Sequence, residues 1–421
     1  MSTSRVCRLC NSDETEIAWS LCPAPYGDLF QKDQLSAIGL KSHSLTLMLC
    51  RNCHLLQLAE EVDAKQIYSD YVYQSSVTAG LKSYYQRLAQ GMVNLAELNP
   101  SSLVVDVGSN DGTGLRPFQE CGMRVLGVEP SHDPAKVAVG AGIPTLNEFL
   151  NDESVKKVIS ELGFAQLVCA NYVAANVPSP VNFFRNIRSM LTSDGWVSIV
   201  TGYHPDQFAI GMFEYINHDH LSYFTVNSAL YLAKESGLIL VSAQRVEHKG
   251  GSIHLIFRTM ESNAHPDDSV QQLLQRETWL RVTELDTYTS FADEVKLKGN
   301  EIRHELAKLN SQNLAGIGAS ISTTHLMYQF GLNDFVSTLF DDDINKIGRY
   351  SPGLGLPVLG LENLSEMNFK IVVILAWQHS GVLLKRLREI DEKLKVFIPM
   401  PFCMYEDMQS LHTFGMHRDG V

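Results

Sequence analysis

The chain has 421 residues, of which 45% are hydrophobic and 19% are charged, and its formal net charge is −13. This length suggests two or three domains of about 150 residues each, with a sizeable core. The acidic balance argues against nucleic acid as the main partner. We find no signal peptide and no apolar run near the roughly 18 residues of a membrane span. We therefore expect a soluble, cytoplasmic globular protein without a membrane partner.

Residues 1–65 carry two C-x-x-C pairs, Cys7/Cys10 and Cys50/Cys53, which are separated by 39 residues. In a reducing compartment such pairs favour metal or redox chemistry over disulfides. Four thiolates match a tetrahedral structural zinc site, in which protein ligands fill every position and none is left for catalysis. A redox centre is the alternative, although neither pair opens a helix after a βαβ strand.

Residues 66–100 have the apolar spacing of a helix. Residues 101–262 then alternate strands and helices, which predicts a mostly parallel sheet. The candidate strands are Leu103–Val107, Val125–Val128, Ala165–Ala170, Trp196–Val200, Leu238–Arg245 and Ser252–Arg258.

One segment reads strand, glycine turn, helix, strand and acid. The apolar run Leu103–Val107 ends in the turn Gly108–Gly112, and a second run, Arg124–Val128, ends at Glu129. Glycines let a ligand approach the backbone closely. An acid about 20 residues past the turn can accept hydrogen bonds from both ribose hydroxyls of an adenosine. This segment therefore indicates a nucleoside site.

The turn reads G-S-N-D-G and lacks the G-x-G-x-x-G pattern that cradles a pyrophosphate. Asp106 precedes it and Asp111 lies inside it. Carboxylates would repel a pyrophosphate but suit the ammonium and sulfonium groups of S-adenosylmethionine. The alternative is an ordinary α/β turn with solvated acids.

A cluster of polar and titratable residues follows the fourth strand, where Phe213–Phe224 reads FEYINHDHLSYF. Histidine exchanges protons near neutral pH, and a neighbouring acid can fix its tautomer. The H-x-H pair could instead bind a metal, but no third ligand is evident nearby. A polar loop with structural histidines is the remaining alternative. The cluster contains Glu214, His218, Asp219, His220 and Tyr223.

The C-terminal part begins with a polar linker, His265–Asp268, and a long amphipathic helix or helix pair from Val270 to about Asn310. A second α/β unit starts at Leu314, where the strand LAGIGA ends in Gly316-x-Gly318. Its later strands are expected at Phe335–Phe340, Ile371–Ala376 and Val396–Ile398.

Together these motifs resemble the nucleotide-sugar C-methyltransferases, which use S-adenosylmethionine to methylate 4-keto deoxysugars. The resemblance covers nearly the whole chain, through the paired C-x-x-C module, YVYQSS, VDVGSNDGT, GVEPS, CANYVAANV, FEYINHDHLSYF, GIGAS, GRYSPG and VVILAW. It implies an α/β protein with an N-terminal zinc-binding module (1–65), a central class I methyltransferase Rossmann-like domain (66–262), and a second Rossmann-like domain after linker helices (263–421). The sugar would lie in a cleft between domains.

The resemblance also implies roles for individual residues. His220 would be the general base that takes the C-3 proton, and Asp219 would orient it. The enolate would receive a hydrogen bond from His218, Tyr223 or Asn217. The cofactor would be held by Asp106, Gly108, Ser109, Asn110, Asp111, Gly112, Glu129, Pro130, Ala170 and Asn171. The sugar nucleotide would meet Tyr71, Tyr73, Ser75, Asn176, Gly316, Gly318, Ala319, Ser320, Arg349 and Tyr350.

The chain departs from the family pattern on the acceptor side. Asn217 replaces a tyrosine, Asn176 a histidine, and Ser322 a phosphate-contacting lysine, while Ile317 and Thr323 replace a tyrosine and a glycine. The resemblance implies thymidine diphosphate as the nucleotide, and the altered C-terminal loop leaves guanosine or cytidine diphosphate open. The chain is expected to be a monomer or a weak homodimer.

Three other functions fit parts of this pattern. O-methylation of a sugar or small molecule needs only a base. A catalytically retired cofactor-binding protein would tolerate the replaced residues, although His218 and His220 argue against it. A dehydrogenase fits poorly, because the first turn lacks the pyrophosphate pattern and the second is incomplete.

Overall fold

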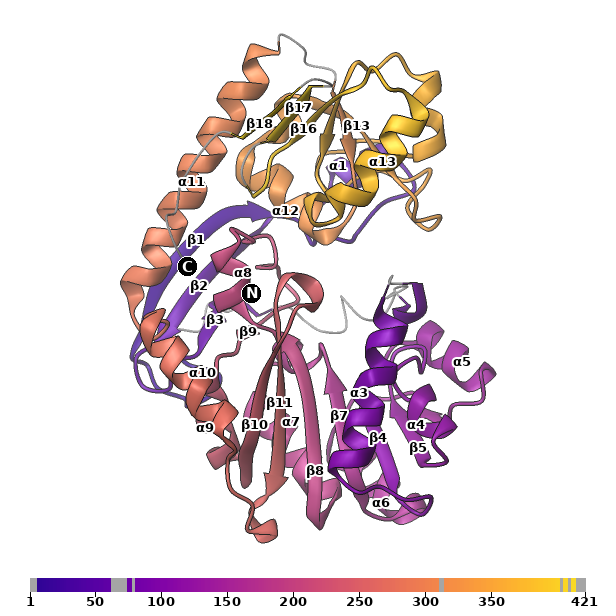
Figure 1. The fold of residues 1–421 in the computed structure, drawn as a ribbon, viewed down its shortest axis with the longest axis vertical. Coiled ribbons are helices and arrows are strands. Elements are labelled where there is room, and N and C mark those ends of the chain that lie inside the picture. The colour runs from indigo at the N-terminus through magenta and orange to yellow at the C-terminus, as the bar shows by residue number, and fades with distance from the viewer. Residues whose placement is uncertain are drawn as a thin grey trace. The chain divides into compact units, whose positions relative to one another are not determined.

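The structure is a computed structural model that describes residues 6–61, 74–77, 80–309, 314–401, 404–407 and 410–413 (Figure 1). Its internal contacts divide the chain into two units. Unit 1 comprises Met1–Glu16, Met48–Asp206 and Asp219–Leu285, and unit 2 comprises Ile17–Leu47, Gln207–His218 and Asp286–Val421. The chain therefore passes between the units several times. The boundaries predicted at residues 65/66 and 262/263 stay a prediction.

Unit 1 contains a seven-stranded sheet with the order β10-β11-β8-β7-β4-β5-β6. β11 is antiparallel to both of its neighbours, and the remaining pairs are parallel. All six strands expected in this region are present, and the short β6 is additional. The strands are β4 (Leu103–Val107), β5 (Arg124–Val128), β6 (Thr145–Leu146), β7 (Ala165–Asn171), β8 (Leu191–Gly202), β10 (Leu238–Val246) and β11 (Ser252–Thr259).

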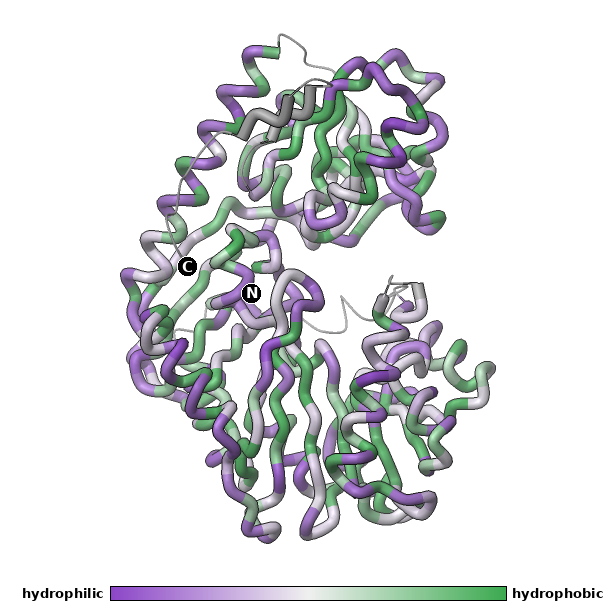
Figure 2. Tube along the Cα trace, viewed as in Figure 1, coloured by the Kyte–Doolittle hydropathy of each residue, from purple (hydrophilic) through white to green (hydrophobic). Residues whose placement is uncertain are grey.

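Helices cover both faces of this sheet (Figure 1). Alternate side chains of β4 point to opposite faces, so Val104 joins one core cluster, whereas Val105 joins the other. The strands are accordingly coloured mostly hydrophobic in Figure 2. The first cluster includes side chains of α3 (Leu81–Leu95), α4 (Arg116–Glu120) and α5 (His132–Gly140), and the second those of α6 (Asp152–Leu162), α7 (Pro180–Met190), α9 (Val226–Glu235) and α10 (Asp268–Trp279).

Two helices of unit 1 begin at capping boxes. The Asn151 side chain accepts from backbone N–H groups at the start of α6, and Ser154 reaches back to the Asn151 backbone. Thr225 and Ser228 do the same for α9. Each box satisfies backbone donors that a helix cannot pair internally, and so fixes where the helix starts.

A separate four-stranded sheet has the order β1-β2-β3-β9. Its strands are β1 (Thr15–Ala24), β2 (His43–Cys50), β3 (Leu56–Leu58) and β9 (Ser222–Tyr223). The sequence showed few periodic elements before residue 65, and these strands were not predicted. Buried and exposed residues alternate regularly along only part of β1, so the period-two pattern that predicts a strand is weak there.

Unit 2 has its own seven-stranded sheet, with the order β14-β13-β12-β15-β16-β17-β18. The first five strands are parallel, and the last two are antiparallel. The parallel part repeats the order of β6-β5-β4-β7-β8 in unit 1. The strands are β12 (Leu314–Ile317), β13 (Val336–Asp341), β14 (Val358–Gly360), β15 (Ile371–Ile374), β16 (Lys395–Ile398), β17 (Met404–Asp407) and β18 (Ser410–Thr413).

The helical stretch expected from Val270 to about Asn310 is a pair, α10 and α11 (Leu285–Lys308). The buried face of α11 repeats at helical spacing through Tyr288, Phe291, Val295, Ile302 and Leu306. The other helices of unit 2 are α1 (Gln34–Ile38), α8 (His204–Ala209, partly in unit 1), α12 (Ile321–Phe330) and α13 (Ser380–Ile390).

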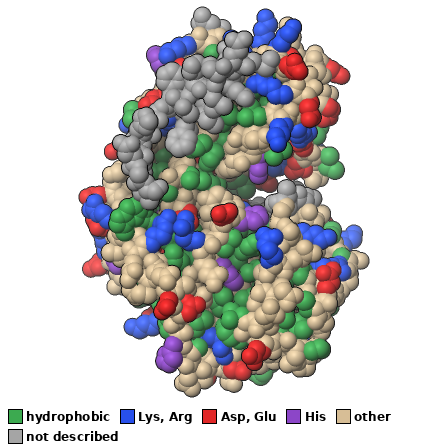
Figure 3. Space-filling model, in the orientation of Figure 1, with side chains coloured by type: hydrophobic (Ala, Val, Ile, Leu, Met, Phe, Trp, Pro, Cys, Tyr) green, Lys and Arg blue, Asp and Glu red, His purple; other side chains and the backbone are tan. Residues whose placement is uncertain are grey.

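Charged side chains of both signs are scattered over the face of the protein that Figure 3 displays. Among the described residues, none of the helices combines the length and apolar character needed to cross a membrane.

Candidate active site

The four predicted metal ligands lie together in unit 1. The Sγ atoms of Cys7, Cys10, Cys50 and Cys53 are all within 4.8 Å of one another. The Cys7–Cys53 and Cys10–Cys50 sulfurs are each 3.5 Å apart. Four thiolates about 2.3 Å from one zinc ion would be about 3.8 Å apart. The cluster therefore has nearly the dimensions of a tetrahedral zinc site.

The two cysteine pairs form the same knuckle. Asn11 N donates to Cys7 O at 2.9 Å, and His54 N donates to Cys50 O at 3.1 Å. Both residues that follow a pair have a left-handed backbone, with φ of 58° at Asn11 and 57° at His54. Hydrogen bonding with Cys50 raises the pKa of Cys7 to about 12 and also raises the pKa of Cys53. The pKa of Cys50 is correspondingly lowered by its hydrogen bonds with Cys53 and Cys7. A divalent cation would favour ionisation of the whole cluster.

The predicted cofactor loop follows β4. Its backbone is left-handed at Gly108, Asn110 and Gly112, with φ of 70°, 51° and 78°. A Cβ atom on Gly108 would lie 2.3 Å from Val173 Cγ2, so only glycine fits. Ser109 and Asp111, the other residues of the loop, are buried. The loop is therefore a tight turn of defined shape at the carboxyl end of a parallel strand.

Glu129 follows β5 and is 5% exposed. Its Oε2 accepts a hydrogen bond from Asn110 N at 2.8 Å, and its Oε1 accepts one from Ser131 N at 2.7 Å. Burial raises its pKa. A carboxylate has about four acceptor positions, so two remain after these bonds. Glu129 is thus held in place by the loop and keeps acceptor capacity for two hydroxyl groups. Pro130 follows it directly.

Asp106, in β4, is fully enclosed. Burial, together with the nearby charge of Glu129, raises the pKa of Asp106 to about 8. Its Oδ1 has no hydrogen-bond partner among the described residues. A buried unpaired acceptor is costly, and a cationic group would relieve that cost. This feature fits the ammonium or sulfonium of the expected cofactor.

Ser75 lies against the cofactor loop. The turn Ser75–Val77 donates from Ser75 N to Asn110 Oδ1 at 2.8 Å and from Ser76 N to Asp111 Oδ2 at 2.9 Å. Ser75 was expected to meet the sugar, and these backbone contacts place it beside the expected cofactor residues. Tyr71 and Tyr73, which were also expected to meet the sugar nucleotide, lie outside the described residues.

Ala170 and Asn171 end β7, the neighbour of β4. They therefore lie where the strand order reverses, which is the usual ligand site of such sheets. Asn171 Oδ1 is buried and has no hydrogen-bond partner among the described residues. Asn176 follows in a short 3₁₀ turn, Ala174–Asn176.

The predicted catalytic segment divides between the two units. Asp219, His220 and Tyr223 belong to unit 1 with the cofactor loop, whereas Asn217 and His218 belong to unit 2. His220 and Asp219 are half-buried. The rings of His220 and Tyr223 meet edge to face, with centroids 6.4 Å apart. Tyr223 is fixed in β9, opposite Leu56 of β3.

In unit 2, His218 is enclosed by other rings. Its centroid is 5.2 Å from that of Tyr26, 5.5 Å from that of His325 and 6.1 Å from that of His43. Burial lowers its pKa to about 4, so the imidazole is neutral at pH 7. A neutral imidazole can donate from one nitrogen. Asn217 is also buried.

The residues expected at the nucleotide lie on two loops of unit 2. Gly316 and Ile317 are the last residues of β12, and Gly318 and Ala319 form the turn that follows. The Ser320 side chain then caps α12 by accepting a hydrogen bond from Thr323 N. Gly318 has φ of 114°, and a Cβ on it would lie 2.7 Å from that of Ala376. The second loop carries Arg349, whose Nη1 donates to Phe30 O, and Tyr350, whose N donates to Gln31 O.

Glu214 was named from the sequence without a role, and two further polar residues of unit 2, Asp341 and Lys346, were missed. Glu214 is buried, accepts from Trp377 Nε1 and Gln378 Nε2, and has its pKa raised to about 7 by burial. Asp341 ends β13, and Lys346 pairs with Asp28 at 3.0 Å. Asp341 carried a readable signal, because it is an acid at the end of the second strand, as Glu129 is.

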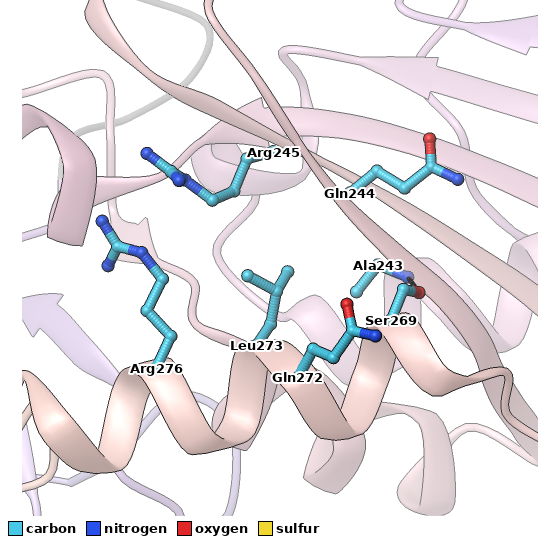
Figure 4. A pocket seen from close by; sticks show the side chains of 7 residues that line it. All are labelled: Ala243, Gln244, Arg245, Ser269, Gln272, Leu273 and Arg276. Atoms are coloured by element: carbon cyan, nitrogen blue, oxygen red, sulfur yellow. Dashed lines mark hydrogen bonds between the residues drawn. The ribbon is translucent and has the colours of Figure 1, made fainter.

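A shallow pocket of about 380 Å³ lies between β10 and α10 in unit 1 (Figure 4). It includes none of the predicted site residues. Two of its side chains, Arg245 and Arg276, pair with the same carboxylate, Asp206. The pocket is lined by Ala243, Gln244, Arg245, Ser269, Gln272, Leu273 and Arg276.

Three family models match consecutive parts of the chain. They are described as "Putative zinc binding domain" over residues 7–68, "Methyltransferase domain" over residues 73–243, and "C-methyltransferase C-terminal domain" over residues 247–401. The curated C-methyltransferase NovU from Streptomyces niveus is 26% identical over 400 residues, covering 94% of this chain and 95% of NovU.

Solved structures also match part of the chain. Magnesium protoporphyrin IX methyltransferase from Synechocystis, with bound S-adenosylhomocysteine, has a TM-score of 0.35 and 13% identity, covering 46% of this chain and 92% of its own. A 1,6-didemethyltoxoflavin-N1-methyltransferase from Burkholderia thailandensis has a TM-score of 0.32 and 16% identity, covering 49% and 96%. The three family models, together with a curated relative that is similar along nearly the whole chain, identify this protein as an S-adenosylmethionine-dependent C-methyltransferase with an N-terminal zinc-binding domain.

Proposed function

We propose that this enzyme methylates the carbon beside the ketone, at C-3, of a nucleotide-diphosphate 4-keto-6-deoxy sugar, in branched-sugar biosynthesis. The observation that supports this most directly is a half-buried histidine, His220, which follows an acid and belongs to the same unit as the cofactor loop. A carbon becomes nucleophilic only after it loses a proton, so a C-methyltransferase needs a base and a donor that stabilises the enolate, whereas an O-methyltransferase needs only a base.

His220 is the proposed base. Its imidazole would take the C-3 proton, and Asp219 would favour the protonated ring electrostatically. The buried Tyr223 ring meets the His220 ring edge to face and restricts its orientation. A histidine held in one orientation can receive a proton without first searching for its position.

Negative charge then develops on the ketone oxygen, and a hydrogen-bond donor must stabilise it. His218, Tyr223 and Asn217 are the proposed donors. The low pKa of His218 keeps its ring neutral, with a single N–H. Nε2 lies 3.3 Å from His43 O, so His218 would donate to the enolate only after its N–H leaves that carbonyl. Removing a donor of this kind typically slows a reaction about 100- to 1000-fold.

The cofactor supplies an electrophilic methyl group when it is bound. Glu129 is the proposed acceptor for its ribose hydroxyls, and the turn at Gly108 and Gly112 gives the ligand close access to the backbone. Asp106 and Asp111 would attract its positive charge. The zinc ion would hold the cysteine knuckles together and would take no part in methyl transfer.

The test is solvent exchange at the carbon beside the ketone. In deuterium oxide, wild type with S-adenosylhomocysteine should exchange the C-3 hydrogen of a 4-keto sugar nucleotide. His220→Ala should lose both exchange and methyl transfer by at least about 1000-fold while its cofactor affinity stays near normal. His265→Ala, at an exposed histidine of unit 1, is the matched control and should retain both. Methyl transfer without exchange would instead indicate O-methylation.

A further inference from the structure

Unit 2 repeats the hydrogen-bonding pattern that holds Glu129 in unit 1. Asp341 Oδ2 accepts from Ala319 N, in the turn after β12, at 2.6 Å, and its Oδ1 accepts from Asp343 N at 2.9 Å. Glu129 likewise accepts from the turn after β4 and from the residue two positions ahead. In both units one carboxylate joins the first turn of a βαβ element to the end of its second strand.

The position of Asp341 in the sheet is also that of Glu129. β13 pairs with β12 in parallel, and β12 lies between β13 and β15, where the strand order reverses. Ligands of open parallel sheets bind at the carboxyl edge of this switch point. The turn there has a glycine with positive φ, Gly318, and leads into α12, a helix of ten residues.

Asp341 retains the capacity to bind a ligand. Its two backbone hydrogen bonds use two of about four acceptor positions on a carboxylate. Glu129 is 5% exposed, whereas the half-buried Asp341 is more accessible. The backbone donors fix the carboxylate, so that hydroxyl groups would meet an oriented acceptor.

The charge around Asp341 is partly balanced within unit 2. Asp342 pairs with Arg386, and Lys346 Nζ donates to Ala319 O at 2.9 Å and pairs with Asp28 at 3.0 Å. Lys346 thus places a cation beside the Gly318–Ser320 turn. An anionic group of a ligand at this turn would meet Lys346 and the first amides of α12.

We propose that Asp341 determines specificity by accepting hydrogen bonds from the 2′- and 3′-hydroxyls of the substrate's nucleotide. This inference rests on the proposed function, because it assumes that the substrate is a nucleotide-linked sugar. It goes further in naming the class: a ribonucleoside diphosphate in preference to a 2′-deoxyribonucleoside diphosphate such as that of thymidine.

Binding of free nucleotides to the full-length protein tests this selectivity without turnover. The cofactor site is first saturated with S-adenosylhomocysteine, so that adenine nucleotides cannot bind there. The diphosphates of adenosine, guanosine, cytidine and uridine are then titrated calorimetrically beside their 2′-deoxy forms and thymidine diphosphate. At least one ribonucleotide should bind about tenfold more tightly than its deoxy form, since a hydrogen bond to a charged group is lost.

Asp341→Asn should bring this ratio close to one. Asp342→Asn is the matched control, because it makes the same chemical change at the next, exposed residue, and it should keep the ratio. Equal binding of ribo and deoxy forms, no binding of any diphosphate, or an unchanged ratio in Asp341→Asn would each overturn the proposal. If Asp341→Asn fails to fold, the wild-type ratio still decides. Exchange at C-3 with tight binding of thymidine diphosphate would leave the proposed function standing and refute only the role of Asp341.

Discussion

The two units place an acid at the same point of the same strand order, yet they surround it differently. In unit 1 the turn beside Glu129 carries Asn110 and Asp111, and Asp106 is enclosed beneath it. In unit 2 the turn beside Asp341 reads G-I-G-A-S and carries no charge. The topology accounts for the position of the acid, and the loop sequence accounts for the kind of ligand. A carboxylate-rich turn suits a cation, whereas the amides of an uncharged turn suit an anion.

The largest effect is expected at the four-cysteine metal site, which belongs to unit 1. Cys50→Ser should lose bound zinc and destabilise unit 1 by several kcal/mol, because structural zinc contributes directly to folding. Metal analysis and calorimetric melting measure this. Cys22→Ser, at an exposed cysteine of unit 2, should keep both the metal and the melting temperature. Unchanged zinc in Cys50→Ser would contradict the four-thiolate site.

A smaller effect, on cofactor affinity, should show that Glu129 and Asp341 bind different ligands. Glu129→Gln should weaken S-adenosylmethionine binding about 10- to 100-fold, because it removes a charged acceptor for the ribose hydroxyls. Asp341→Asn should leave that affinity unchanged. Calorimetric titration of both variants with S-adenosylmethionine makes the comparison. If both variants weakened this binding equally, the two acids would not serve separate ligands.

The smallest expected change concerns a single proton in unit 1. The pKa of Asp106 is raised to about 8, so the ligand-free carboxyl is mostly protonated at pH 7. A bound cation favours the ionised form and lowers this pKa, so binding should release a proton, and affinity should rise with pH up to about 8. Calorimetry in buffers of different ionisation enthalpy should show more proton release for wild type than for Asp106→Asn. Equal release would show that Asp106 does not sense the cofactor.

Much of unit 1 was predictable from sequence because its signals are local. The apolar run of β4, the glycine turn and Glu129 lie within a short stretch, and the spacing of the two C-x-x-C pairs favours a metal site. Most strands of the two seven-stranded sheets were found for the same reason, but β6, β14, β17 and β18 were not predicted. Their ends shifted by a few residues, as with β8, which extends from Leu191 rather than Trp196.

What sequence could not supply depends on contacts between distant residues. Nothing in FEYINHDHLSYF indicates that His218 packs with Tyr26, His43 and His325, while His220, two residues later, belongs to the other unit. Asp341 was readable in principle. It ends the strand that follows the Gly316-x-Gly318 turn, at the position that Glu129 has after the Gly108–Gly112 turn.

The arrangement of sulfurs in the cysteine cluster affects which disulfides form when the metal-free protein is oxidised. Two sulfur contacts of 3.5 Å join different knuckles, Cys7 with Cys53 and Cys10 with Cys50. Once the metal is lost, oxidation can therefore join residues from opposite ends of the N-terminal module as well as the two cysteines of a pair. Such crossed disulfides would preserve much of the shape of the module while blocking the return of zinc. An oxidised sample would thus keep its fold but bind no zinc until the disulfides are reduced, which makes a reductant as important as zinc during purification.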